Sequence, residues 1–163
     1  MLYGVQAVIF DLDGVLINSE SLAQQSGIEV CRRHGFIVPP GMWPTFRGKQ
    51  SVDIFRAILA ACPGSGDTRD IDLLVAERRQ RYLELAEVGL QMFPGALEFV
   101  RAAAEHWPNK LGLATSSSQQ SQRQAFQKFK LAPYFSAIVT AEDVKHGKPY
   151  PDCYRLVAER LRV

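Results

Sequence analysis

The chain has 163 residues, of which 47% are hydrophobic and 22% charged, and its formal net charge is +2. This length is enough for one substantial hydrophobic core, and the composition is typical of a globular protein rather than a fibrous or disordered one. Because the charge is nearly balanced and no apolar stretch reaches the length of a membrane span, neither nucleic acid nor a membrane is expected as a partner.

The cysteines indicate a reducing environment. Cys31, Cys62 and Cys153 are scattered, odd in number and without Cys-x-x-Cys spacing. Such a pattern does not suit a disulfide framework or a zinc site. The start of the chain also lacks the length and the basic residues of a secretory signal. We therefore expect a cytoplasmic protein.

The first expected element is a strand that ends at two acids. The apolar run 5–10 predicts a buried strand, and Asp11 and Asp13 follow it directly. Open α/β sheets bind ligands beyond the carboxyl ends of their strands. One acid can act as a nucleophile while the other transfers a proton, if a cation screens their repulsion. Gly14 permits a sharp turn after them, and Val15 argues against an EF-hand loop, which carries Asp or Asn there.

The segment that follows shows helical patterns only. A helix is expected from Ser19, as its N-cap, to about His34. Further helices are expected over 51–61 and 70–88, separated by loops rich in proline and glycine. We therefore expect residues 18–88 to form a helical insertion.

A β-α pattern resumes after this insertion. The expected elements, in order, are a helix after Gly95, a strand over 110–114, a helix capped by Ser118, a strand over 136–140 and a helix that begins at Pro151. With the first strand, these elements predict a parallel α/β sheet. A three-stranded sheet leaves a strand edge unpaired, and we expect the last helix to expose an apolar face at Tyr154, Val157 and Leu161. Self-association through this core edge is therefore a further expectation.

Two later segments carry candidate phosphate ligands. Thr115 ends a strand, so its hydroxyl and the backbone N–H of Ser116 can meet a phosphate oxygen near a helix N-terminus. Alternatively, the serines of this segment only cap the helix. Lys148 is the natural positive charge, and Pro149 restricts its backbone, as suits a fixed ligand. Its alternative is an exposed loop lysine.

Three segments together resemble a known family. Phe10–Leu16, 111–117 and 147–151 are similar, in this order, to the first three motifs of the haloacid dehalogenase superfamily, and most similar to those of the β-phosphoglucomutase-like phosphatases. The resemblance implies an α/β fold with a parallel, Rossmann-like sheet core, shortened at its C-terminus, and an inserted helical cap.

The implied domains follow from this resemblance. Residues 1–17 and 89–163 would form the core, and residues 18–88 the cap. In the family, the core continues to a further strand that ends in an acidic pair and supplies a magnesium ligand. No such pair follows Lys148. The sequence therefore leaves open a piece of a longer enzyme, a shortened relative with impaired metal binding, or a catalytically silent α/β module.

The resemblance also implies roles for single residues. Asp11 would attack phosphorus and form an aspartyl-phosphate, and Asp13 would act as general acid and then as general base. Mg²⁺ would bind the Asp11 carboxylate and the Asp13 backbone carbonyl. Thr115, Ser116 and Lys148 would bind the phosphate. The implied activity is a magnesium-dependent phosphatase for a small phosphorylated metabolite, such as a sugar or polyol phosphate.

The expected cap contains one candidate for substrate selection. Arg47, Gly48 and Lys49 form a basic loop that suits an anionic or polar substrate, although a simple turn between helices remains an alternative. In β-phosphoglucomutase an arginine lies three residues after the equivalent glycine, and here Ser51 takes that place. This difference argues against a sugar phosphomutase, which stays the second activity considered. The sequence names neither the substrate nor the oligomeric state.

Overall fold

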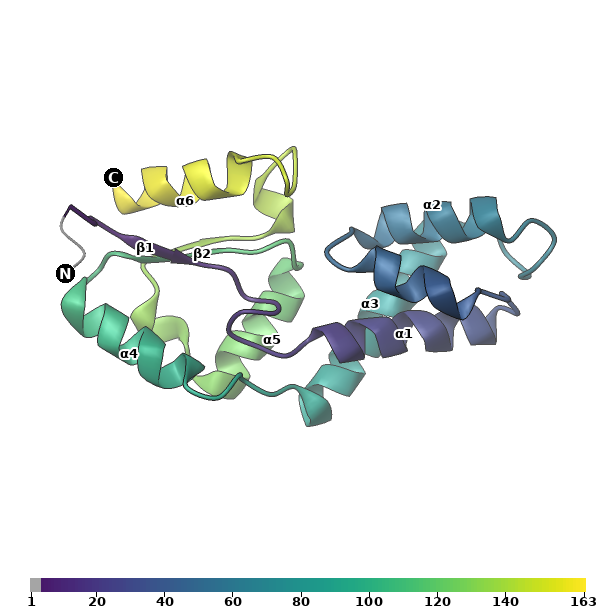
Figure 1. Cartoon of the computed structure of the whole chain (residues 1–163), viewed down its shortest axis with the longest axis horizontal. Coiled ribbons are helices and arrows are strands. Elements are labelled where there is room, and N and C mark those ends of the chain that lie inside the picture. The colour runs from purple at the N-terminus through teal and green to yellow at the C-terminus, as the bar shows by residue number, and fades with distance from the viewer. Residues whose placement is uncertain (1–3) are drawn as a thin grey trace. The chain divides into compact units, whose positions relative to one another are not determined.

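A computed structural model describes residues 4–163 and divides the chain into two compact units (Figure 1). The core unit consists of Met1–Asn18 together with Leu90–Val163, and the helical unit is Ser19–Gly89. These limits lie one residue from the domain boundaries expected from the sequence. None of the helices in residues 4–163 combines the length and the apolar character needed to cross a bilayer.

The core unit contains a parallel sheet, as the sequence predicts. Its strands are β1 (Val8–Phe10), β2 (Leu111–Ala114) and β3 (Ala137–Val139), in the order β1-β2-β3. Its helices are α4 (Ala96–His106), α5 (Gln119–Phe129) and α6 (Asp152–Leu161), with short 3-10 helices η2 (Ala132–Tyr134) and η3 (Ala141–Asp143). In Figure 1, α6 covers one side of the strands, and α4 and α5 lie on the other. The α/β fold with a parallel sheet is thereby confirmed.

The expectation that α6 exposes an apolar face is mostly wrong. Val157 and Leu161 of α6 are 0% and 4% exposed and pack on β2 and β3 with Cys153. The apolar face that the sequence places in solvent is therefore mostly covered by the sheet, because α6 returns across it after β3 in the usual manner of a β-α unit. Of the three residues named, only Tyr154 is exposed, at 40%.

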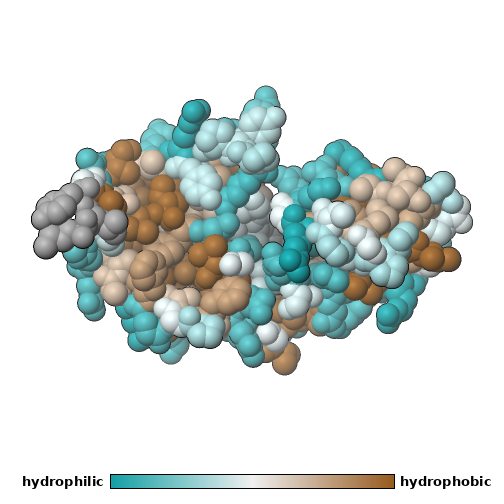
Figure 2. Space-filling view, viewed as in Figure 1, coloured by the Kyte–Doolittle hydropathy of each residue, from teal (hydrophilic) through white to brown (hydrophobic). Residues whose placement is uncertain are grey.

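Both β3 and β1 are edge strands of the sheet, and exposed apolar residues lie beside β1. This strand pairs with β2 alone among residues 4–163. Val8 and Ile9 are partly exposed, and Val5 and Phe99 are exposed at 38% and 61%. Figure 2 shows apolar side chains gathered on the surface of the core unit. Self-association through this edge stays a prediction, because the structure contains a single chain.

The helical unit contains α1 (Glu20–Arg33), the 3-10 helix η1 (Pro40–Phe46), α2 (Ser51–Ala61) and α3 (Ile71–Gly89). Its core is built from apolar faces of these helices, and the most buried large side chains are Val30, Phe55, Ile58 and Leu74. The sequence indicates only a loop after Pro39, where η1 begins. Ser19 is the N-cap residue of α1, but its side chain makes no capping hydrogen bond, because its backbone is already helical.

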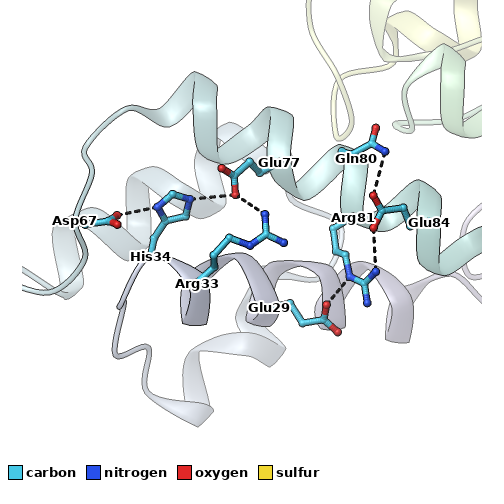
Figure 3. Close-up of polar contacts among 8 residues, drawn as sticks. All are labelled: Glu29, Arg33, His34, Asp67, Glu77, Gln80, Arg81 and Glu84. Carbon is cyan, nitrogen blue, oxygen red and sulfur yellow. Dashed lines mark hydrogen bonds and ion pairs between the residues drawn. The ribbon is translucent and has the colours of Figure 1, made fainter.

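A polar network joins the end of α1 to α3 (Figure 3). His34 Nδ1 lies 2.7 Å from Asp67 Oδ1, and His34 Nε2 lies 3.0 Å from Glu77 Oε2, which also accepts a hydrogen bond from Arg33. Because both ring nitrogens meet carboxylates, the geometry suits the imidazolium, in which both nitrogens donate. Burial lowers the pKa of His34, but the hydrogen bonds to Asp67 and Glu77 outweigh it and raise this pKa above its ordinary value.

Protonated His34 is expected to stabilise the helical unit. Because its pKa is higher in the folded unit, the stabilisation is fully present below the unfolded value of about 6.5 and is lost as pH rises through the folded value. Unfolding followed by Trp43 fluorescence, with Trp107 replaced by Phe, reports on this unit. The stability advantage of the parent over His34→Gln should shrink as pH rises from about 5.5 to about 9. The same change at His106, in α4, is the control. An advantage that grows with pH contradicts this prediction.

Candidate active site

The carboxyl end of β1 positions two acids around a buried leucine. Leu12 follows Asp11 and is 0% exposed, so its side chain is anchored in the core unit while the flanking Asp11 and Asp13 are only partly buried. Gly14, with φ of 75°, then takes the left-handed conformation of a tight turn. The backbone N–H groups of Leu16 and Ile17 both donate to Leu12 O, at 2.9 and 3.1 Å, and close this turn. The two acids are therefore held on a rigid strand end.

Asp11 forms an ion pair at the centre of the site. Its Oδ2 lies 2.7 Å from Lys148 Nζ, and its Oδ1 accepts a hydrogen bond of 2.8 Å from Leu12 N. Lys148 Nζ also donates to the carbonyl of Ala114, the last residue of β2, at 3.0 Å. Burial lowers the pKa of Lys148, but the neighbouring Asp11 and Tyr154 outweigh it and raise this pKa above its ordinary value. The lysine is therefore a fixed cation beside the first acid.

Two hydroxyl groups from the end of β2 meet the second acid. Asp13 Oδ2 accepts hydrogen bonds from Ser117 Oγ at 2.7 Å and from Thr115 Oγ1 at 3.2 Å. Thr115 is buried, its oxygen accepts from Ser117 N, and its own N–H donates to Val139 of β3. Ser116 is exposed. The chain after β2 thus presents hydroxyl and backbone donors at the strand end where the acids lie.

The structure brings most of the candidate residues together. Asp11 pairs with Lys148, and Asp13, two residues further along the chain, accepts a hydrogen bond from Thr115. Ser116 lies between two residues that contact Asp13. Ser118 caps α5 by accepting from Ser121 N, as expected. The remaining three candidates, Arg47, Gly48 and Lys49, belong to the helical unit.

These three residues form an exposed loop between η1 and α2. Arg47 Nε lies 3.5 Å from Glu20 Oε2, and both side chains are largely exposed. Lys49 Nζ lies 6.0 Å from the centre of the Phe46 ring, and Gly48 has a φ of 73°. Exposed ion pairs of this kind contribute little to stability. The loop is therefore cationic and available for other contacts.

The sequence profile of the haloacid dehalogenase-like hydrolases matches residues 8–163. The chain belongs to this family. A relative from Thermotoga maritima, named phosphorylated carbohydrates phosphatase, is 32% identical over 163 residues, which cover 98% of this chain and 72% of the relative. Hexitol phosphatase A from Escherichia coli is 33% identical over 158 residues, which cover 94% of this chain and 67% of the relative. The crystal structure of CbbY from Rhodobacter sphaeroides shares the fold, with a TM-score of 0.85 at 22% identity over 98% of this chain and 73% of that protein.

The site of this haloacid dehalogenase-like hydrolase offers oxygen ligands for Mg²⁺. The Asp11 carboxylate and the Asp13 backbone carbonyl, two residues apart at the end of β1, are hard oxygen ligands. Mg²⁺ in proteins is often held by one or two carboxylates, with waters and substrate phosphate in its other positions. No cluster of three or more His, Cys, Asp or Glu residues suited to a metal occurs in residues 4–163. The residues present fit the ion with one carboxylate, that of Asp11, and the backbone carbonyl of Asp13 as its protein ligands.

The two acids of η3, Glu142 and Asp143, make structural contacts. Glu142 Oε2 accepts from Gln119 N at the start of α5, at 2.9 Å. Asp143 accepts from the N–H and the hydroxyl of Thr140 and pairs with Arg160 at 2.8 Å. The carboxylates of Glu142 and Asp143 therefore hold η3 and its neighbours together.

Sequence reasoning missed two neighbours of the site. Ser117 lies in the segment 111–117 that resembles the second motif, but the sequence assigns it no contact of its own and offers a helix cap only as an alternative; in the structure its hydroxyl contacts Asp13. Tyr154 was placed on an apolar helix face, but its ring lies 5.0 Å from Lys148 Nζ. The Thr-Ser-Ser run after a strand was the available signal for Ser117. No pattern in the sequence connects Tyr154 to Lys148.

Proposed function

We propose that this hydrolase is a magnesium-dependent phosphatase that acts on a small phosphorylated metabolite, a sugar or polyol phosphate, through an aspartyl-phosphate. The observation that carries the proposal is the pairing of Asp11 with Lys148 at the end of β1, with Asp13 two residues further on. The names of the relatives from Thermotoga maritima and Escherichia coli support the substrate class, since they act on phosphorylated carbohydrates and hexitol phosphates.

In the first step, a carboxylate oxygen of Asp11 attacks phosphorus. A bond forms between this oxygen and phosphorus, and the bond from phosphorus to the ester oxygen breaks. Asp13, in its protonated form, gives its proton to the departing ester oxygen, so the alcohol leaves as a neutral molecule. The Lys148 ammonium offsets the charge of Asp11 and of the phosphoryl group as they approach.

In the second step, water cleaves the aspartyl-phosphate. Asp13, now a carboxylate, accepts a proton from the attacking water, whose oxygen bonds to phosphorus. The bond between phosphorus and the Asp11 oxygen breaks, and inorganic phosphate and the Asp11 carboxylate are released. The hydroxyl of Ser117 orients Asp13 through the 2.7 Å contact described above. When bound, Mg²⁺ supplies positive charge that screens the two acids and the phosphoryl oxygens.

Release of inorganic phosphate tests this proposal. The protein, incubated with p-nitrophenyl phosphate and with hexose or hexitol phosphates, should release phosphate when Mg²⁺ is present. Removal of the metal with EDTA should reduce the rate by roughly 100-fold or more, because several kcal/mol of charge stabilisation is lost. A rate that is the same with and without the metal contradicts the metal requirement. An inactive protein would support the silent α/β module instead.

Sugar phosphomutase activity is separated from hydrolysis by the fate of the phosphoryl group. A mutase transfers it between positions of the sugar and releases little phosphate. Ser51, which replaces the arginine of β-phosphoglucomutase, accepts a hydrogen bond of 2.5 Å from Arg78 within the helical unit. This side chain is therefore engaged in packing the helices. We accordingly place hydrolysis first.

We also propose that Arg47, Gly48 and Lys49 select the substrate. The charge and exposure of the loop support this role. Replacing Arg47 or Lys49 with Ala should lower kcat/KM for sugar phosphates by about tenfold, since one charge-assisted contact is lost. Hydrolysis of p-nitrophenyl phosphate should change less than twofold. The exposed Arg56→Ala variant, on α2, is the control. Equal losses on every substrate would show that the loop is structural.

A further inference from the structure

We propose that Tyr154 is a positioning residue for Lys148, because its aromatic ring holds the lysine ammonium against Asp11. Its effect on turnover rests on the proposed phosphatase activity. The contact itself does not, so it can be tested separately.

Three groups surround the ammonium nitrogen of Lys148. Lys148 Nζ lies 2.7 Å from Asp11 Oδ2 and 3.0 Å from the carbonyl oxygen of Ala114. It also lies over the Tyr154 ring, 5.0 Å from the ring centre. A lysine has three N–H donors; the oxygen atoms of Asp11 and Ala114 accept from two of them, and the Tyr154 side chain also helps to raise the pKa of the ammonium group through its hydroxyl. The electron-rich face of the ring attracts the remaining side of the cation.

The backbone below Tyr154 is firmly anchored. Cys153 and Val157, on either side in α6, are 2% and 0% exposed and belong to the core cluster on the sheet. Tyr154 itself is 40% exposed, so its ring is not needed to fill that core. A tyrosine has few rotatable bonds, and a ring on such an anchored helix is a rigid support.

Lys148 has a flexible side chain that is not held in place by its own backbone segment. Its side chain has four flexible carbon–carbon bonds, and it comes from the segment between η3 and α6 rather than from a strand or helix. Its side chain is 22% exposed, so water competes for the ammonium. The Tyr154 ring, which covers one side of the ammonium, restricts the rotamers of the Lys148 side chain and the access of water to it. We infer that loss of the ring lets the ammonium leave the position beside Asp11.

The contact can be observed directly by NMR. The ε-CH₂ protons of Lys148 should resonate upfield of those of the other lysines in the parent protein, because they lie over an aromatic ring. The upfield shift should remain in Tyr154→Phe and disappear in Tyr154→Leu. Assignment comes from the signal that is lost in Lys148→Ala. If the shift is absent in the parent or persists in Tyr154→Leu, the proposal is wrong.

The effect of losing the Tyr154 ring on catalysis is measured by the turnover rate. Tyr154→Leu should reduce kcat for p-nitrophenyl phosphate by about tenfold, the factor that corresponds to one partly desolvated cation–π contact. Tyr154→Phe should lose clearly less than Tyr154→Leu, about threefold at most, because it keeps the ring and loses only the hydroxyl. Tyr150→Leu is the matched control, since Tyr150 is 59% exposed and its ring packs on His146. It should leave kcat unchanged.

A double-mutant cycle separates positioning from a general structural effect. In a Lys148→Ala background, Tyr154→Leu should cause no further loss, because the group it positions is gone. A further loss of about tenfold there overturns the proposal, as does a Tyr154→Phe variant as impaired as Tyr154→Leu. If the parent shows no turnover, the proposed function fails while the NMR shift still decides the contact.

Discussion

Replacing Asp11 with Asn is expected to reduce phosphatase turnover by roughly 10⁴-fold or more, as loss of a catalytic nucleophile does in other enzymes. An amide oxygen is a poor nucleophile and cannot form the acyl-phosphate. The neutral amide also leaves Lys148 without the anion that lies 2.7 Å away. Both effects act on the chemical step, so the loss should be in kcat rather than in KM.

The same substitution should leave the fold intact. The Asn oxygen can still accept the hydrogen bond that Leu12 N donates to Asp11 Oδ1 at 2.8 Å. The side chains of Asp11 and Lys148 are 31% and 22% exposed, so breaking this mostly buried pair costs more than breaking an exposed one, about 1–2 kcal/mol with the polar amide still facing Lys148. The thermal midpoint should therefore fall by roughly 2–8 °C, with the transition still cooperative.

Steady-state rates and unfolding curves on the same preparation check both statements. Asp53→Asn is the matched control, because Asp53 is an exposed acid paired with Arg56 on α2, away from the candidate site in the sequence. It should retain full activity. Residual activity of Asp11→Asn within tenfold of the parent would remove Asp11 from the role of nucleophile.

The fold of the core unit follows from the sequence because its strands are short, apolar and bounded by clear signals. Leu111 and Leu113 are 0% exposed, as a central parallel strand requires. Ser118 is the N-cap residue of α5, as its hydroxyl predicts. Pro151, where the sequence predicts the last helix to begin, lies one residue before α6. The strand ends also locate the acids, since ligand-binding residues gather at the carboxyl ends of parallel strands.

The remaining contacts depend on tertiary structure. The sequence shows Tyr154, Val157 and Leu161 on one helical face, but not that the sheet covers the last two and leaves the first beside Lys148. Likewise, Thr115 and Ser117 alternate with the exposed Ser116, yet only the packed chain shows that both hydroxyls reach Asp13. Such pairings join residues about a hundred positions apart, beyond the range of local patterns.

Replacing Gly112 with Ala is expected to destabilise the core unit strongly. Gly112 lies within β2, opposite Ile9 of β1 and Ala137 of β3. A Cβ at this position would lie 2.2 Å from Val157 Cγ1 and 3.0 Å from Leu161 Cδ1. Real carbon–carbon contacts are never so short, so α6 must move away from the sheet or the side chains must leave their preferred rotamers.

Neither a shift of α6 nor a change of the Val157 rotamer is easily accommodated. Val157 is 0% exposed, and a valine in a helix has one strongly preferred χ1 rotamer. Overpacking of a tight core costs about 1–3 kcal/mol, and the rigidity of this contact favours the upper end. A loss of about 3 kcal/mol corresponds to a fall in thermal midpoint of roughly 6–12 °C for a chain of this size.

A second substitution shows whether the clash is the cause. Val157→Ala removes the γ-methyl groups, so Gly112→Ala in that background should cost less than about 1 kcal/mol, although Val157→Ala is itself destabilising. Urea unfolding followed by Trp107 fluorescence, with Trp43 replaced by Phe, reports on the core unit alone. Ser136→Ala, an exposed substitution just before β3 in the core unit, is the control and should be nearly neutral. A Gly112→Ala variant within about 0.5 kcal/mol of the parent, or an equal cost in both backgrounds, would show that α6 does not pack on β2 as closely as the structure has it.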